Sequence, residues 1–178
     1  MRGAGLVGAR RYGLAVLKRM GGIVQTWRMY RALPYQEGAF VRAAAVGLVE
    51  TWMGLRLLGF RRWKRIVVNR VAEGGGSSES ARLTPSLSAE RIAQLASGTA
   101  RNLFLRTNCL EQSLVLWSLL RMRGYAADLK FGARKEAGEF EAHAWVEMQG
   151  NALGEDREEH QHYAAFDGAI AAAGTPAE

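Results

Sequence analysis

A cysteine and a histidine stand where they could act as nucleophile and base. Cys109 is the only cysteine in the chain, and it lies at the expected start of an apolar helix that ends at Gly124. Unpaired amides and the helix dipole favour a thiolate there, and such positions lower thiol pKa values from about 8.5 to roughly 3.5–7.5. His143 follows 34 residues later. Together the two residues favour nucleophilic catalysis, whereas either one alone is more typical of a structural side chain.

A catalytic histidine is usually oriented by a third group that accepts its other ring N–H. Glu155 and Asp156 follow the next expected turn and could return beside His143 on a neighbouring strand. Asp167 is a more distant candidate. Because acidic runs are also typical of solvated surfaces, position alone leaves this third role open.

Two other polar clusters could bind ligands. His160 and His162 lie beside two glutamates, but an exposed polar loop is the favoured interpretation, so we expect no metal site and no cofactor. A basic stretch contains Arg61, Arg62, Lys64 and Arg65. It could cover the core as a solvated helix face, or contact nucleic acid or anionic lipid, but no specific nucleic-acid-binding motif is present. As a binding surface, it favours an acidic partner.

The sequence pattern around these residues predicts that the chain has three parts. Residues 1–72 form a basic helical region, residues 73–88 a Gly/Ser-rich linker or loop, and residues 89–178 the catalytic core. Charge follows the same division. Residues 1–70 hold 14 basic and two acidic residues, a local charge of +12, and the remainder carries −5.

Three helices are predicted. Apolar residues at helical spacing begin near Phe40 and include Val41, Ala44, Ala45, Leu48, Trp52 and Leu55. A second helix begins after Ser88, a good N-cap, with Ile92, Leu95, Ala96, Thr99 and Leu103 on its apolar face. The third begins near Asn108, which with Glu111 resembles a capping box, although Asn replaces the usual Ser or Thr. Its middle is apolar almost all round, so it belongs in the centre of the fold.

After Gly124 the hydrophobic period changes from 3.6 to 2, which predicts strands. Residues 128–133 alternate, a polar turn spans 134–138, and 140–148 alternate again, so the pair is expected to form a hairpin. A turn at 149–151 leads into a short segment at 152–155, and residues 163–167 could add a strand. Helices followed by antiparallel strands predict an α+β fold.

Composition narrows the class of protein. With 178 residues, 48% hydrophobic, the chain can bury a core and corresponds to one domain or a small domain with a helical extension. A single cysteine excludes an internal disulfide and suits a reducing compartment. No run of 18 uncharged apolar residues is present, and basic residues interrupt any signal-peptide core. We therefore expect a cytoplasmic protein without a membrane span.

Four blocks of sequence carry a resemblance to a known family. They are N-C-L-E-Q-S-L-V-L-W-S-L-L-R-M-R-G at 108–124, L-K-F-G-A-R-K-E at 129–136, A-H-A-W-V-E at 142–147 and G-N-A-L-G-E at 150–155. Their order and spacing resemble the transglutaminase-like leader peptidases of lasso-peptide biosynthesis. The resemblance covers about residues 30–168.

The resemblance implies a papain-like or transglutaminase-like cysteine protease core, in which a central Cys helix packs on a small antiparallel sheet. It implies a Cys–His–acid triad in which Cys109 is the nucleophile and His143 the base. The family's aspartate, twelve residues after the histidine, is replaced by Glu155, with Asp156 as the alternative acid.

The resemblance also implies partners. Family members cut the leader from a ribosomally made precursor peptide, which a small leader-recognition protein presents. A separate macrolactam cyclase resembling asparagine synthetase then closes the ring with ATP.

Three alternatives remain open at this point. The chain could be another transglutaminase-like amide hydrolase or acyltransferase, because a fold does not settle a reaction. It could be a non-catalytic scaffold that binds the precursor or the cyclase. Its basic region could instead be a nucleic-acid or membrane-surface module, although we expect no nucleic-acid partner.

Overall fold

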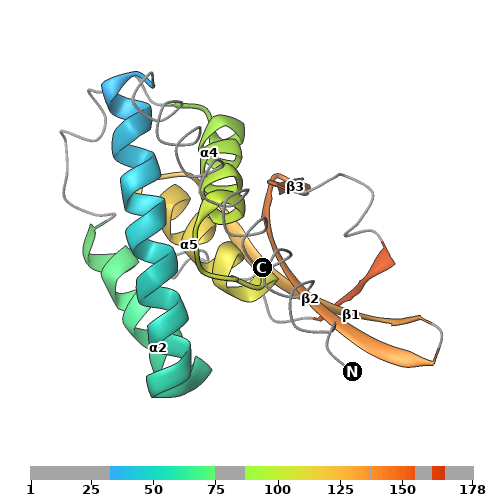
Figure 1. Cartoon of the computed structure of the whole chain (residues 1–178). Helices are drawn as coiled ribbons and strands as arrows, with labels where there is room; N and C mark the ends of the chain where they lie inside the picture. The colour runs from blue at the N-terminus through green and yellow to red at the C-terminus, as the bar shows by residue number, and fades with distance from the viewer. Residues whose placement is uncertain (1–32, 75–86, 137, 155–161, 167–178) are drawn as a thin grey trace, which may run out of the picture. The chain divides into compact units, whose positions relative to one another are not determined.

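The computed structural model describes residues 33–74, 87–136, 138–154 and 162–166 (Figure 1). The chain divides into two compact units, Met1–Ala39 and Phe40–Glu178. Apart from the first residues of helix α2, everything below concerns the second unit.

Helix α2, Tyr35–Gly74, consists of two helical stretches joined at Gly59. Gly59 has φ 74° and ψ 167°, a backbone conformation open essentially to glycine alone, so the chain changes direction there (Figure 1). An ion pair of 2.7 Å between Arg70 and Glu50 links the two stretches. The predicted helix is confirmed, and Val41, Ala44 and Leu48 of its expected apolar face are buried. The kink was not predicted.

The ring of Trp63, in the second stretch of α2, packs directly on Gly54 in the first. A Cβ atom added to Gly54 would overlap with ring carbons of Trp63. We therefore expect Gly54→Ala to destabilise the protein by about 1–3 kcal/mol in urea unfolding, although alanine is the better helix former. Gly98→Ala is the matched control in α4, because its Cβ would meet nothing within 4 Å, and it should stabilise by about 0.5–1 kcal/mol. Equal effects of the two substitutions would contradict the close contact.

Two further helices begin where the sequence predicts them. Helix α4, Ala89–Asn102, has Ser88 as N-cap, whose hydroxyl accepts a 3.2 Å hydrogen bond from the Arg91 amide. Helix α5, Cys109–Met122, is central, with Leu114, Val115, Leu116, Trp117 and Leu120 all buried. Leu48, Ala100 and Val115 form one core cluster that joins α2, α4 and α5.

In the described part of the chain, four strands form an antiparallel sheet in the order β3-β2-β1-β4. They are β1 (Asp128–Glu136), β2 (Glu139–Met148), β3 (Asn151–Leu153) and β4 (Ala164–Ala165). The predicted hairpin is confirmed, but its expected turn at 134–138 is too long. Residues 134–136 continue β1 and pair with 139–141, because Arg134 forms a 2.7 Å ion pair with Glu141 across the strands. The strand expected at 163–167 is limited, in the described part, to the two residues of β4.

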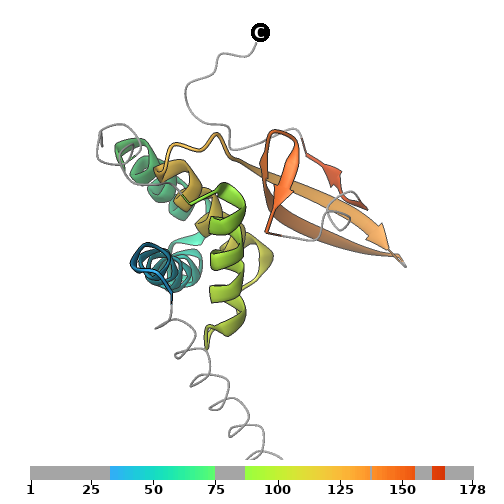
Figure 2. The same ribbon diagram turned by 90° about the horizontal axis from the view of Figure 1, so that it is seen from above.

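The two faces of the sheet have different surroundings. Leu129, Ala144 and Val146 are buried on the face that α5 covers, and both α4 and α5 lie on the same side of the β1–β2 hairpin (Figure 2). Residues that alternate with these, including His143 and Trp145, belong to the opposite face. The helices and the small antiparallel sheet are the α+β arrangement that the sequence predicts.

Among the described residues, α2 is the one helix long and apolar enough to cross a membrane by length and composition. Its best 18-residue window has a mean hydropathy of 1.3 and is 22% buried. Core helices and signal sequences meet the same criterion, so the expected lack of a membrane span stays a prediction. The predicted boundaries at 72 and 88 stay predictions as well.

Candidate functional site

Cys109 is the first residue of α5, and its side chain is half-buried. The predicted capping box is confirmed: the Asn108 side chain accepts a 2.9 Å hydrogen bond from the Glu111 amide, and Glu111 Oε2 accepts one of 2.9 Å from the Asn108 amide. Gln112 Nε2 donates to the Thr107 carbonyl and hydroxyl oxygens, both at 3.2 Å. These contacts hold the backbone on both sides of the cysteine.

An ion pair that the sequence analysis missed anchors this helix end to α2. The Glu111 side chain is only 2% exposed, and its Oε1 accepts a 2.8 Å hydrogen bond from Arg56. The same guanidinium donates to the Trp52 carbonyl at 3.0 Å and lies 4.1 Å above the Trp52 ring. Arg56 therefore compensates the charge of the buried Glu111 carboxylate and fixes the start of α5, which carries Cys109, to α2.

Helix α5 is joined to the strand that carries His143. Ser113, one helical turn after Cys109, donates a buried 2.8 Å hydrogen bond to the carbonyl of Ala144, the residue after His143. Farther along, Trp117 Nε1 donates to the Ala127 carbonyl at 3.1 Å, just before β1. The start of α5 and the middle of β2 are therefore neighbours. The structure brings together the elements of the predicted nucleophile and base.

The imidazole of His143 lies among aromatic rings on the sheet face opposite α5. Its ring is 5.0 Å from that of Tyr163 and 6.0 Å from that of Trp145, and it stacks on the latter at 15°. Its register partner is Gly132, where a Cβ would lie 2.9 Å from the Trp145 ring. Among the described strands, β2 pairs at His143 with β1 alone, because β3 begins its pairing at Val146. Within the described part of the chain, the edge of β2 at His143 that faces away from β1 therefore has no partner strand.

A charged cluster lies beside His143 on the same face of the sheet. Arg134 donates to Glu141 at 2.8 Å through Nε and contacts it at 2.7 Å through a terminal nitrogen, while its guanidinium lies 4.8 Å above the Tyr163 ring. The hydrogen bond from Arg134 lowers the pKa of Glu141 below its ordinary value of 4.5, and one from Tyr163 acts in the same direction. The same bond to Glu141 raises the pKa of Arg134.

Because its folded-state pKa is lowered, Glu141 contributes stability above its unfolded pKa and loses it as the pH falls through the folded value. We expect a small gap in melting temperature between wild type and Glu141→Gln at pH 7, which closes as the pH falls well below 4.5. Glu139→Gln, on the same hairpin but without an ion pair to any described residue, is the control. A gap that persists or widens in acid would contradict the assignment.

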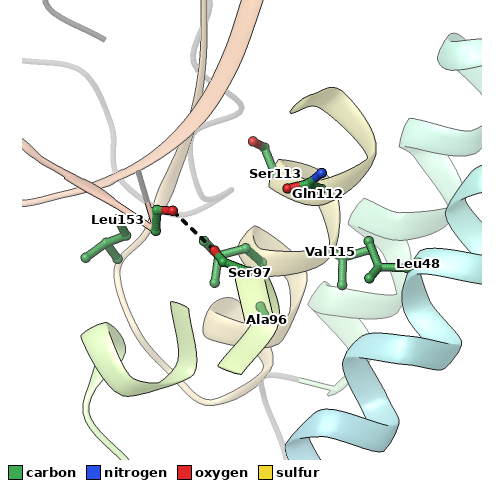
Figure 3. Close-up of a pocket in the computed structure, with 9 residues that line it drawn as sticks. Leu48, Ala96, Ser97, Gln112, Ser113, Val115 and Leu153 are labelled. Carbon is green, nitrogen blue, oxygen red and sulfur yellow. Dashed lines mark hydrogen bonds between the residues drawn. The ribbon is translucent and has the colours of Figure 1, made fainter. Parts of the chain in front are cut away.

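All three candidates for the third group of the predicted triad, Glu155, Asp156 and Asp167, lie outside the described residues. His160 lies outside them as well. The residue just before Glu155 is held: the Gly154 carbonyl accepts a 3.2 Å hydrogen bond from Ser97 of α4 (Figure 3). This bond borders a cavity of about 40 Å³, which Gln112 and Ser113 of α5 also line. The cavity has room for little more than water.

The other predicted residues lie on the surface. Arg61, Arg62 and Arg65 are exposed and Lys64 is half-buried, all in the second stretch of α2. His162 is exposed. No group of three or more His, Cys, Asp or Glu residues within the described ranges could hold a metal ion.

Cys109 thus begins a capped central helix, and this helix is hydrogen-bonded to the antiparallel strand that carries His143. The family model of the transglutaminase-like superfamily matches residues 51–166, and the chain belongs to this superfamily. Its domains are typically cysteine-based enzymes. No curated protein and no solved structure matches the chain.

Proposed function

We propose that this protein is a cysteine peptidase that removes the leader from a ribosomally made lasso-peptide precursor before the macrolactam forms. One observation carries the proposal: Cys109 begins the capped helix α5, and Ser113 docks that helix on β2 beside His143. Membership of the transglutaminase-like superfamily supports cysteine chemistry. The four sequence blocks that resemble leader peptidases support the choice of substrate.

In the proposed reaction, the Cys109 thiolate attacks the last carbonyl carbon of the leader and a C–S bond forms. The amide of Cys109 stabilises the oxyanion, since the capping box uses those of Asn108 and Glu111 instead. The C–N bond breaks as His143 protonates the departing amine. His143 then takes a proton from water, which attacks the thioester carbonyl and releases the leader carboxylate and the thiol.

This mechanism sets a geometric requirement on His143. Its imidazole must reach the thiol from the open edge of β2, because α5 covers the other face of the sheet. Glu155 is proposed to accept the other ring N–H, with Asp156 as the alternative. The Ser97–Gly154 hydrogen bond supports this role, because it fixes the residue before Glu155 against α4, directly after the strand β3 that pairs with β2.

The proposed context is cytoplasmic and involves two partners. A small leader-recognition protein presents the precursor, and an asparagine-synthetase-like cyclase consumes the product. Arg61, Arg62, Lys64 and Arg65 are proposed to form a surface for an acidic partner.

The test is cleavage of a precursor peptide by the purified full-length chain, with and without the recognition protein, followed by mass spectrometry. We expect a leader fragment with a free carboxylate and a core with a new amino terminus. An intact precursor in the presence of the partner would refute the proposal.

The superfamily favours a second candidate, acyl transfer to an amine. Adding an excess of a primary amine to the same assay separates the two reactions. A leader–amine conjugate as the main product, in place of the free acid, would identify an acyltransferase.

A further inference from the structure

The turn of α2 exposes large apolar side chains. The two helical stretches of α2 form a helical hairpin, distinct from the β1–β2 hairpin. We name residues 57–65, which include Gly59, the hairpin tip (Figure 1). Leu57 is 78% exposed, Leu58 42% and Phe60 38%. Three neighbouring side chains of this size left in water indicate a binding surface, whereas a single exposed leucine would be ordinary.

The hairpin tip is also strongly basic. No acidic residue occurs between Glu50 and Glu73. Arg56 and Arg70, on either side of the tip, are neutralised by Glu111 and Glu50. In contrast, Arg61, Arg62 and Arg65 are exposed and have no ion pair with any described residue. The tip therefore offers free positive charges next to apolar side chains, which complements a ligand with carboxylates beside bulky apolar groups.

Contacts place the hairpin tip beside the proposed catalytic centre. Arg56, immediately before the tip, is bonded to Glu111, two residues after Cys109. Phe60 of the tip packs edge-on against Phe131 of β1, with ring centroids 6.0 Å apart. Phe131 is the register partner of Ala144, next to His143. A chain bound on the tip would thus lie close to the start of α5, which carries Cys109, and to the sheet face that α5 covers.

We propose that the hairpin tip binds the substrate peptide, through a segment in which Asp or Glu alternates with large apolar residues. This inference rests on the proposed function. The adjacency to Cys109 favours a peptide over an anionic membrane, because a bilayer seated on the tip would cover the approach to the thiol. Arg61, Arg62 and Arg65 pair with the carboxylates, and Leu57, Leu58 and Phe60 contact the apolar side chains.

The test measures binding separately from cleavage, using the full-length Cys109→Ala protein and fluorescence anisotropy. Three labelled 14-residue peptides serve as probes: one with Glu-Leu pairs separated by Gly-Ser, one with Lys for Glu, and one with Ser for Leu. We expect saturable binding of the first peptide alone. Its Kd should rise about tenfold in Arg61→Glu/Arg65→Glu and in Leu57→Ser/Leu58→Ser, and should increase with salt.

Matched controls carry the same changes elsewhere on the exposed surface. Arg101→Glu/Lys135→Glu reverses two charges, and Phe140→Ser removes an exposed aromatic ring; both should bind like the parent. Circular dichroism checks the fold of each variant. Unchanged binding in the tip variants, or equal binding of the Lys peptide, would overturn the proposal.

Vesicles of phosphatidylcholine with 30% phosphatidylglycerol test the membrane alternative by co-sedimentation. Tip-dependent binding to these vesicles, without binding of the peptide, would assign the tip to a lipid surface and also overturn the proposal. The binding assay needs no turnover. A negative result in it therefore would not contradict leader cleavage, and a negative result in the cleavage assay would not contradict peptide binding at the hairpin tip.

Discussion

Replacing Cys109 by alanine should abolish leader cleavage, with a loss on the order of 10⁴-fold or more, because no other thiol exists in the chain. The fold should survive, since the Cys109 side chain is half-buried and the capping box is made by Asn108 and Glu111. Mass spectrometry of the precursor measures the loss, and thermal unfolding checks the structure.

Ser118→Ala is the matched control for this experiment. It lies on the same helix, and its hydroxyl bonds only within α5, to the Val115 carbonyl. Cleavage should be unaffected. If Cys109→Ala retained wild-type cleavage, the cysteine would be structural, and the proposed catalytic role of Cys109 would be wrong.

Arg56→Met should be the next most damaging change, although Arg56 is far from Cys109 in sequence. It leaves the buried Glu111 carboxylate without its partner, which should cost about 1–3 kcal/mol; this is less than for a fully buried pair because Arg56 is 49% exposed. We also expect weaker leader cleavage, because Arg56 then no longer anchors the start of α5, which carries Cys109, to α2.

A second substitution separates the charge from the packing. In Arg56→Met/Glu111→Gln the glutamine can still accept from the Asn108 amide but carries no charge, so stability should largely recover. Arg70→Met is the control, since its partner Glu50 is solvated and its loss should cost at most about 1 kcal/mol. Equal losses for Arg56→Met and Arg70→Met in urea unfolding would contradict the anchoring role.

The start of α5 could be predicted because its signals are local. Asn108 and Glu111 are three residues apart, and the apolar run after them fixes the helix as central. The β1–β2 hairpin was equally accessible, because strict alternation determines which residues share a face. Alternation also places His143 and Trp145 on one side of β2, as the structure confirms.

Features that depend on distant contacts could not be predicted. Nothing near Arg56 in the sequence indicates an ion-pair partner 55 residues away. A glycine inside a helical pattern does not by itself indicate a kink such as that at Gly59. The turn was placed too early because Arg134 and Glu136 look like turn residues. The cross-strand ion pair between Arg134 and Glu141, at the position where β1 extends beyond the expected strand, is apparent only once the register is known. Tyr163 reaches His143 through a strand pairing that has no local signature.

The core cluster of Leu48, Ala100 and Val115 has a consequence for the integrity of a nicked chain. A single backbone cut within residues 75–86 would separate α2 from α4 and α5 covalently. The apolar cluster and the Arg56–Glu111 pair would still bind the two pieces to each other. Such a protein would behave as a non-covalent heterodimer of its own fragments, and the fragments could be produced separately and recombined.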